Sequence, residues 1–432
     1  MNPSTPTTRW RAWPRSPRPS RLGVASLVAL LSATGLVLVP APASAATGTL
    51  AFNPGTLAFG SVRVGTGSQA QSITVQNTDA NNSVTISSVS IEGLNPNDFV
   101  AQTDCVGTII GTGAQSPKTL GPNETCSVAV KSVPIAVGGR SAQVSVKSDG
   151  SEPDKRATVS ATGTEGYYLA GQFGEVQAFG DAVDHGDATG VDLNAPIVDM
   201  ATTQTNGDGY WLLGLDGGVF SYNAKFFGST GGMPLNQPVV AMSAVPLTDN
   251  LRGDGYWFVA LDGGVFAYGE AAFKGSMGGK PLNEPVIGMV ATPSGNGYWL
   301  VASDGGIFAF GDAGYFGSMG GKPLNEPIAG MAAMPDGSGY WLVALDGGIF
   351  AFGNAPYKGS TGGIALKADI VDMWPSPTGN GYWLAASDGE VFNFGDAPHL
   401  GDLGGGAVDD AIALAGTAPP LSPYSEGPRV AF

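Results

Sequence analysis

Two short apolar runs, separated by an Asp-Gly pair, recur along most of the chain. In one copy the runs cover residues 298–302 and 307–310 and are rich in aromatic and branched side chains. Apolar runs of this length on either side of Asp304-Gly305 predict a β-hairpin with a type I′ turn. Copies of the pattern begin at Gly166, Gly209, Gly255, Gly297, Gly339 and Gly381, at intervals of 42 to 46 residues. A period of this length indicates repeats that stack or surround a common axis.

Each period contains four apolar segments, for example 286–292, 298–302, 307–310 and 315–318. Four antiparallel strands in about 42 residues match the size of one β-propeller blade. The segment 298–302 is apolar on both faces, as expected for a blade that lies between two others.

The phase of the repeats predicts how the ring closes. The repeat region opens near Gly166 with the second strand of a blade, and it ends at 412–416 with an unmatched first strand. We therefore predict a six-bladed β-propeller over residues 165–419, closed by pairing of 412–416 with 167–170. Residues 420–432 are expected to form a C-terminal tail.

Residues 47–164 lack the repeat. They carry short alternating apolar runs, such as Ile73/Val75 and Val144/Val146, between turns rich in Asn, Asp, Gly and Pro. This pattern is typical of antiparallel strands in a β-sandwich, and we expect about seven of them. The predicted fold class is therefore all-β, with an N-terminal sandwich followed by the propeller.

The first 45 residues have the features of a secretory signal. Five arginines precede an apolar run, 22–39, and Ala43-Ser44-Ala45 forms a cleavage site of the A-x-A type. The alternative is an uncleaved membrane anchor, which the Gly, Ser and Thr residues inside the run disfavour. We expect a secreted or cell-surface-associated protein whose mature chain is soluble and has no membrane span.

The charge balance excludes some partners. The full chain carries a net charge of −16, and without the five arginines of the leader this becomes −21. Such a surface repels nucleic acid and anionic lipid, so we expect neither as a partner. Hydrophobic residues make up 43% of the chain, which is enough apolar material for packed domains.

The two cysteines of the chain, Cys105 and Cys126, both lie in the N-terminal domain. In an exported protein they predict a disulfide that closes a loop of about 22 residues. The alternatives, a metal-binding pair or a catalytic thiol, have no His nearby in the sequence.

Around these cysteines the N-terminal domain resembles the hydin-type, choice-of-anchor Ig-like domain. The resemblance rests on Asn97-Asp98-Phe99, Cys105, Leu120-Gly121-Pro122, Cys126, Gly138-Gly139-Arg140-Ser141-Ala142 and Val159-Ser160-Ala161-Thr162-Gly163. It implies an Ig-like β-sandwich that serves as a non-catalytic spacer or adhesion module. One departure is Lys131-Ser132-Val133-Pro134, where members of the family usually place an aromatic residue before the proline.

The repeat region resembles the GYWLVASDGGIFAFGDA-type repeats of exported actinobacterial proteins, some of which are joined to wall-acting hydrolase domains. The resemblance covers about 250 residues. It implies export and association with the cell envelope, and no chemistry.

The sequence offers little catalytic or metal-binding chemistry. Only two histidines exist, His185 and His399, and no G-x-S-x-G, HExxH, P-loop or Rossmann motif stands in a supporting context. We therefore expect no catalytic residues, no metal and no cofactor. A cation site at the ring seam, built from these histidines and neighbouring aspartates, is a minor alternative.

Aromatic and acidic residues recur with the repeats. Five tryptophans follow Gly-Tyr, and we interpret them as core between blades rather than as a sugar-binding stripe: Trp211, Trp257, Trp299, Trp341 and Trp383. Five aspartates start the turns, and they are candidate binding residues if they do more than shape those turns: Asp216, Asp262, Asp304, Asp346 and Asp388. We expect these turns to share a face of the ring with the links 234–238, 281–285 and 323–327.

The expected function is that of a non-catalytic binding or scaffold protein that recognises a protein or polysaccharide of the envelope. The alternative is a carbohydrate-active enzyme, a glycoside hydrolase or lyase, that uses acidic residues near the propeller centre. A concave central pocket with converging acids favours the enzyme, whereas a narrow or filled channel favours the scaffold.

Overall fold

The computed structural model describes residues 48–108, 115–204, 209–248, 250–404 and 410–417, together with a strand at 429–431. The predicted secretory signal lies outside these residues. Within them the only helix is a single 3-10 turn, η1 (Pro96–Asp98), and none is long and apolar enough to cross a membrane. The remaining regular structure is β, as predicted.

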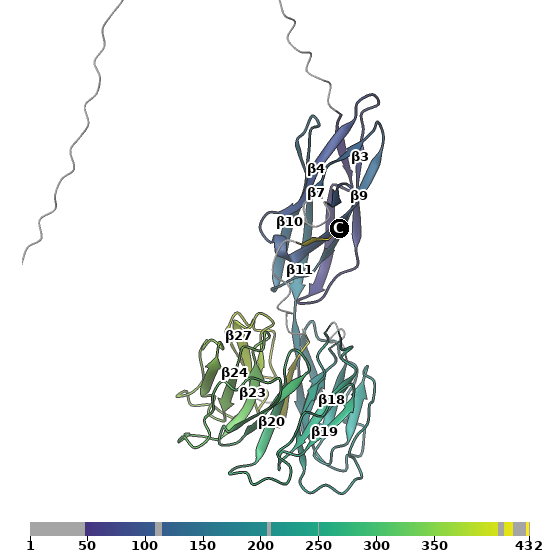
Figure 1. The fold of residues 1–432 in the computed structure, drawn as a ribbon. Helices are drawn as coiled ribbons and strands as arrows, with labels where there is room; N and C mark the ends of the chain where they lie inside the picture. The colour runs from purple at the N-terminus through teal and green to yellow at the C-terminus, as the bar shows by residue number, and fades with distance from the viewer. Residues whose placement is uncertain are drawn as a thin grey trace, which may run out of the picture. The chain divides into compact units, whose positions relative to one another are not determined.

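The N-terminal part contains two five-stranded sheets (Figure 1). The first has the order β1 (Leu50–Asn53), β3 (Gln71–Asn77), β9 (Thr125–Ser132), β5 (Phe99–Thr103) and β30 (Arg429–Ala431). The second has the order β2 (Thr56–Arg63), β11 (Asp154–Thr164), β10 (Gly138–Ser148), β4 (Val84–Glu92) and β8 (Lys118–Leu120), and β6 (Gly107–Thr108) pairs with β7 (Gln115–Ser116). Residues of both sheets, such as Ile73, Val128 and Val144, share one hydrophobic core.

Two strand pairs in these sheets are parallel, although the sequence predicted antiparallel pairing. β2 pairs in parallel with β11, and β30 pairs in parallel with β5, with Arg429 opposite Val100 and Ala431 opposite Gln102. The residues predicted as a C-terminal tail therefore include a strand that extends an N-terminal sheet.

The predicted disulfide is confirmed. Cys105, which follows β5, is bonded to Cys126 in β9, with a Cα–Cα distance of 5.1 Å. Both residues are buried in the core between the sheets.

The repeats form six three-stranded sheets. Their strands, in chain order, are β12 (Gly166–Gly171), β13 (Val176–Gly180), β14 (Ile197–Thr202), β15 (Tyr210–Gly214), β16 (Val219–Tyr222), β17 (Val239–Ala244), β18 (Gly255–Ala260), β19 (Val265–Gly269), β20 (Val286–Ala291), β21 (Gly297–Ala302), β22 (Ile307–Gly311), β23 (Ile328–Ala333), β24 (Gly339–Ala344), β25 (Ile349–Gly353), β26 (Ile370–Pro375), β27 (Gly381–Ala386), β28 (Val391–Gly395) and β29 (Ala411–Gly416). Several of these sheets are labelled in Figure 1.

The ring closes as predicted. β29 pairs antiparallel with β12, with Tyr167 opposite Gly416 and Ala170 opposite Ala413. The first strands of the sheets contact one another in the order β14, β17, β20, β23, β26 and β29, and β29 also contacts β14. The six sheets therefore surround a common axis, which is the arrangement of a β-propeller.

The middle strand of each sheet is buried on both faces. Tyr298 and Trp299 in β21 are 0% and 1% exposed, and Trp299 packs against Tyr340 of the next sheet with 5.8 Å between ring centroids. The same contact joins Trp383 to Tyr167 across the seam, at 5.7 Å. The tryptophans are core residues, as interpreted from the sequence.

The hairpin turns differ from the prediction of type I′. Type I′ needs a positive φ at Asp304, but only Gly305 has one, at 75°. The N–H of Gly305 donates to the carbonyl of Ala302 at 2.8 Å, which defines a β-turn followed by a glycine bulge. Asp304 suits this turn because its Oδ1 accepts the N–H of Gly306 at 2.8 Å.

Each sheet has three strands, and the prediction of four was wrong. The segment 315–318 does not pair as a strand because its backbone is bonded to side chains. The N–H of Phe316 donates to Tyr340 Oη at 3.2 Å, and Tyr340 Oη donates to the carbonyl of Gly317 at 2.5 Å.

Candidate functional site

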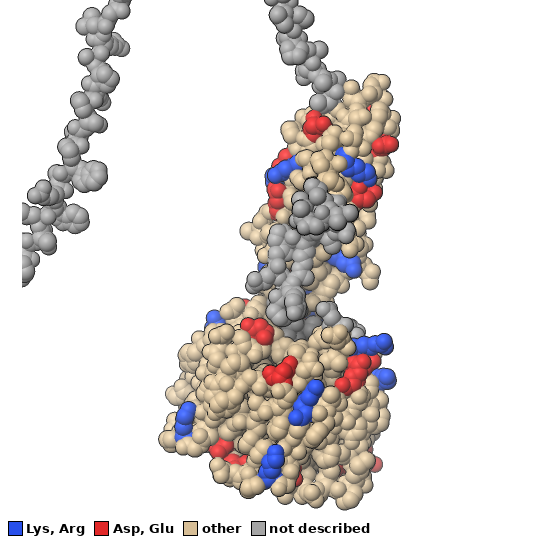
Figure 2. Space-filling model, viewed as in Figure 1, with Lys and Arg blue, Asp and Glu red and all other residues tan. Residues whose placement is uncertain are grey.

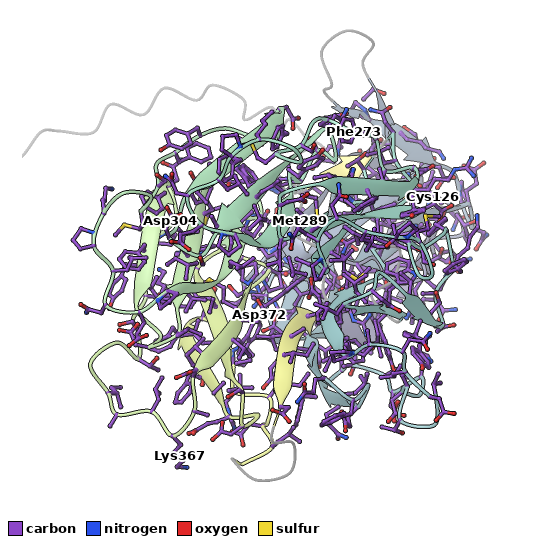
Figure 3. All side chains as sticks on the ribbon, turned by 90° about the horizontal axis from the view of Figure 1, so that it is seen from below. Cys126, Phe273, Met289, Asp304, Lys367 and Asp372 are labelled. Carbon is purple, nitrogen blue, oxygen red and sulfur yellow. A yellow bond between two sulfur atoms is a disulfide. The ribbon has the colours of Figure 1, made fainter. Side chains whose placement is uncertain are left out.

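A cavity of about 160 Å³ lies at the centre of the ring. It is lined by the first strands, each of which contributes one apolar side chain at the same position: Met200, Met242, Met289, Met331, Met373 and Leu414. Met289 lies nearer the middle of the view in Figure 3 than Phe273 or Lys367. The cavity extends toward the loops between the first and second strands, away from the face that carries the Asp-Gly turns.

Two carboxylates line this cavity, Asp199 in β14 and Asp372 in β26. Asp372 Oδ1 accepts the N–H of Met373 at 2.7 Å, and its Oδ2 accepts the N–H of Leu414 in β29 at 2.9 Å. Asp199 repeats the arrangement with the N–H of its own next residue and an N–H of β17, both at 2.7 Å. Each carboxylate therefore joins two adjacent first strands.

Burial dominates the electrostatics of both groups, although part of their surface faces the cavity. Burial raises the pKa of Asp372 to about 7, against the opposing effect of its two N–H donors. Burial also raises the pKa of Asp199 well above its ordinary value, and the nearby charge of Asp372 adds to this effect. Below about pH 7 the neutral form of Asp372 therefore predominates.

Sequence reasoning did not single out these two aspartates. A signal was present, because the tetrapeptide Ile-Val-Asp-Met occurs at 197–200 and again at 370–373. The other first strands carry Ala or Gly in place of the aspartate: Ala241, Gly288, Gly330 and Ala413.

The five candidate aspartates of the Asp-Gly turns are half-buried, and their hydrogen bonds stay within the turn, unlike those of Asp199 and Asp372. Each accepts, through Oδ1, the N–H two residues later at 2.8 to 3.1 Å: Asp216, Asp262, Asp304, Asp346 and Asp388. Leu261, next to one turn, donates its N–H to the carbonyl of Pro238 in the preceding link, and Ser303 does the same to Pro285, both at 3.0 Å. Turns and links thus share a face, as predicted, and a role of these carboxylates in binding stays a prediction.

The segments that follow the third strands form the outer edge of the ring. We call four of them the rim segments: 225–229, 272–276, 314–318 and 356–360. The carbonyl of the first residue in each accepts the indole N–H of the buried tryptophan of the same sheet, at 2.7 to 3.0 Å. The tyrosine of the next sheet accepts the N–H of the third residue and donates its hydroxyl to the carbonyl of the glycine that follows, at 2.5 to 3.2 Å.

The glycine of each rim segment is required by close packing. Gly275 has a φ of 133°, and a Cβ at this position would lie 2.6 Å from Cδ1 of Phe310. The backbone can therefore approach the neighbouring sheet only without a side chain here.

Between the two hydrogen-bonded points, the second residue of each rim segment is an exposed aromatic. Phe226, Phe273, Tyr315 and Tyr357 expose 55%, 59%, 63% and 61% of their surface. The corresponding residues in the remaining two blades are His399 and Asp184. The sequence analysis assigned the rim segments to a fourth strand and so did not identify their exposed aromatics. A signal was present, because in all four rim segments the aromatic stands two residues before the glycine.

Among the described residues, one group of side chains lies close enough together to hold a metal ion: Asp104, Cys105 and Cys126. The two sulfur atoms are bonded to each other in the disulfide and so do not act as thiolate ligands. His399 Nε2 lies 3.8 Å from Asp402 and His185 Nε2 lies 3.4 Å from the Asn223 amide nitrogen. The seam cation site considered from the sequence gains no support from these contacts.

Comparison with known proteins identifies no family. No protein-family model matches the chain, and no curated protein matches it. A Bacteroides thetaiotaomicron protein of unknown function has a TM-score of 0.35 at 12% identity, covering 82% of this chain and 98% of its own. The β-propeller domain of Cps50 (Swd1) from Myceliophteria thermophila has a TM-score of 0.32 at 10% identity, covering 46% of this chain and 65% of its own. Both scores are too low to carry an argument, so the propeller assignment rests on the strand pairing described above.

Proposed function

We propose that this chain is an exported, non-catalytic binding or scaffold protein of the cell envelope. In this proposal an N-terminal Ig-like module carries a six-bladed propeller, and the propeller recognises an envelope protein or polysaccharide. The leader-like first 45 residues, the resemblance of both domains to exported proteins and the buried disulfide support export.

The observation that carries a binding role is the repeated outer edge. Each rim segment is fixed on one side by a tryptophan of its own sheet and on the other by a tyrosine of the next. The ring thus presents the same rigid surface several times, which suits a partner that is itself extended or repetitive.

The centre of the ring favours binding over catalysis. Two acids converge there, as the carbohydrate-active enzyme requires, but both oxygens of Asp199 and of Asp372 already accept backbone N–H groups. The cavity of about 160 Å³ is also smaller than typical ligand pockets, which range from about 300 to 1,000 Å³. These carboxylates fit the role of joining adjacent strands.

The test uses the chain from Ala46 onward and isolated bacterial cell envelopes. We expect the protein to sediment with the envelopes and to release no soluble sugar from them. Glycan hydrolysis that disappears in the Asp199→Asn and Asp372→Asn variants, with the fold retained, would establish the enzyme instead. A protein that stays in the supernatant at every concentration would exclude an envelope-binding role.

A further inference from the structure

The four exposed aromatics of the rim segments share a serine at the same position in the sequence. A serine stands three residues after each one, and the hydroxyls of Tyr315 and Tyr357 lie 3.2 Å from the Oγ atoms of Ser318 and Ser360. The two tyrosine segments therefore present an aromatic face beside hydroxyl groups, and all four have a backbone that is already fixed by hydrogen bonds to buried aromatic residues.

Lysines accompany these aromatics. Lys225 directly precedes Phe226, and Lys274 and Lys358 directly follow Phe273 and Tyr357. Two further lysines fold back onto the segments: Lys280 Nζ donates to the carbonyl of Ser276 at 2.9 Å and Lys322 Nζ to that of Ser318 at 2.8 Å.

This placement is unusual for so acidic a chain. Residues 165–417 contain seven Lys and Arg residues, and six lie between a third strand and the next first strand: Lys225, Lys274, Lys280, Lys322, Lys358 and Lys367. On the face drawn in Figure 2 the basic side chains are spread over the surface, some of them beside acidic ones, rather than gathered in one patch. The rim segments themselves contain no Asp or Glu. Of the acids outside them, Asp312 accepts the hydroxyls of Thr292 and Ser294, and Glu270 accepts the N–H of Arg252. Glu390 lies 3.9 Å from Lys367, which is also outside the rim segments.

We infer that the rim segments form a multivalent site for an anionic polysaccharide, and this inference rests on the proposed binding function. The apolar C–H face of a sugar ring packs on an exposed aromatic face, the serine and tyrosine hydroxyls exchange hydrogen bonds with sugar hydroxyls, and a lysine pairs with a carboxylate or other anionic substituent. One platform of this kind binds weakly. Four of them at equivalent positions in consecutive blades reinforce one another on a single long chain.

Other partners fit the rim less well. A protein interface needs a contiguous apolar centre within about 800 Å² of surface per partner, whereas each rim segment exposes a single aromatic side chain, with a Gly two residues later and a Ser three residues later. Single-stranded nucleic acid also stacks on aromatics, but it needs a continuous basic groove, whereas three of the rim segments carry a single lysine each and the fourth carries none.

The test measures binding of the chain from Ala46 onward to polygalacturonate, with dextran as the uncharged polymer, by affinity electrophoresis at low salt. We expect retardation by polygalacturonate, and a three- to ten-fold weaker affinity for each of Phe226→Ala, Phe273→Ala, Tyr315→Ala and Tyr357→Ala. The variant with all four changes should show no retardation. Its thermal midpoint should stay that of the wild type, because the replaced side chains are exposed.

The matched control is Ile364→Ala. Ile364 is 63% exposed and lies between β25 and β26, after the rim segment 356–360. Its affinity should equal that of the wild type. Equal binding by the four-fold variant, equal retardation by dextran, or equal binding of single-stranded DNA would each overturn the inference.

If the four-fold variant no longer binds polygalacturonate but still sediments with envelopes, the inference holds and the protein has a second contact with the envelope. If the wild type binds polygalacturonate but not envelopes, the inference holds and the proposed envelope role fails.

Discussion

Replacing Asp372 with Asn should change how the stability of the ring depends on pH. In the folded protein burial raises the pKa of Asp372 to about 7, whereas the same group in the unfolded chain titrates near 3.8. A carboxyl whose pKa is raised by folding binds its proton more tightly in the folded state. Its contribution to stability is therefore fully present below pH 3.8 and is lost as the pH rises toward 7.

The size of the effect follows from the shift. A rise of about three pKa units at about 1.36 kcal/mol each corresponds to a loss of about 4 kcal/mol between pH 4 and pH 8. The Asp372→Asn variant would keep one acceptor at this position but turn its amide nitrogen toward the second N–H donor, which costs about 1 to 3 kcal/mol at every pH. The variant should thus be less stable than the wild type at pH 4 and should gain about 4 kcal/mol relative to it by pH 8.

Tryptophan fluorescence during urea unfolding measures this difference. In the chain from Ala46 onward every tryptophan lies in the ring, so the N-terminal sheets do not contribute to the signal. Glu165 titrates in the same range, because burial and then the charges of Asp396 and Asp181 raise its pKa to about 8, but it is present in both proteins and cancels in the difference. Parallel stability curves for wild type and variant from pH 4 to pH 8 would refute the reasoning.

Three further predictions concern stability and the turns. Deleting Asp410 onward should leave β12 with an unpaired edge and promote aggregation, seen as a shift to large species in size-exclusion chromatography; a monomeric truncation of equal stability would contradict the closure. The unreduced protein should show no free thiol with a thiol reagent, and reduction of Cys105 and Cys126 should lower stability by about 3 kcal/mol. Changing all five turn aspartates to Asn should leave folding, envelope binding and its salt dependence unchanged, because Asn Oδ1 accepts the same N–H: Asp216, Asp262, Asp304, Asp346 and Asp388. Weaker binding by this variant would show that the ligand contacts the face that carries the turns.

The repeated pattern carried enough information to predict the ring and its closure. The period of the Gly-Tyr-Trp strands and the unmatched segment 412–416 led directly to the pairing of β29 with β12. The cysteine pair was equally direct, because no other cysteines exist.

The sequence was misleading where side chains replace strand pairing. Residues 315–318 have the composition of a strand, but the hydroxyl of Tyr340 takes the N–H of Phe316 and the carbonyl of Gly317, which a strand would use for pairing. That exchange depends on a contact between two sheets, so a local pattern cannot reveal it. The depth of Asp199 and Asp372 at the ring centre is likewise a property of the closed ring rather than of the tetrapeptide that contains them.

β29 and β30 each complete a sheet whose other strands lie far earlier in the sequence. β29 fills the sheet opened by β12, and β30 lies along β5. During synthesis β12 lacks this partner until β29 has emerged, and β5 lacks its partner on one side until β30 has emerged. A chain that stops before residue 411 therefore exposes an unpaired strand edge in both regions at once.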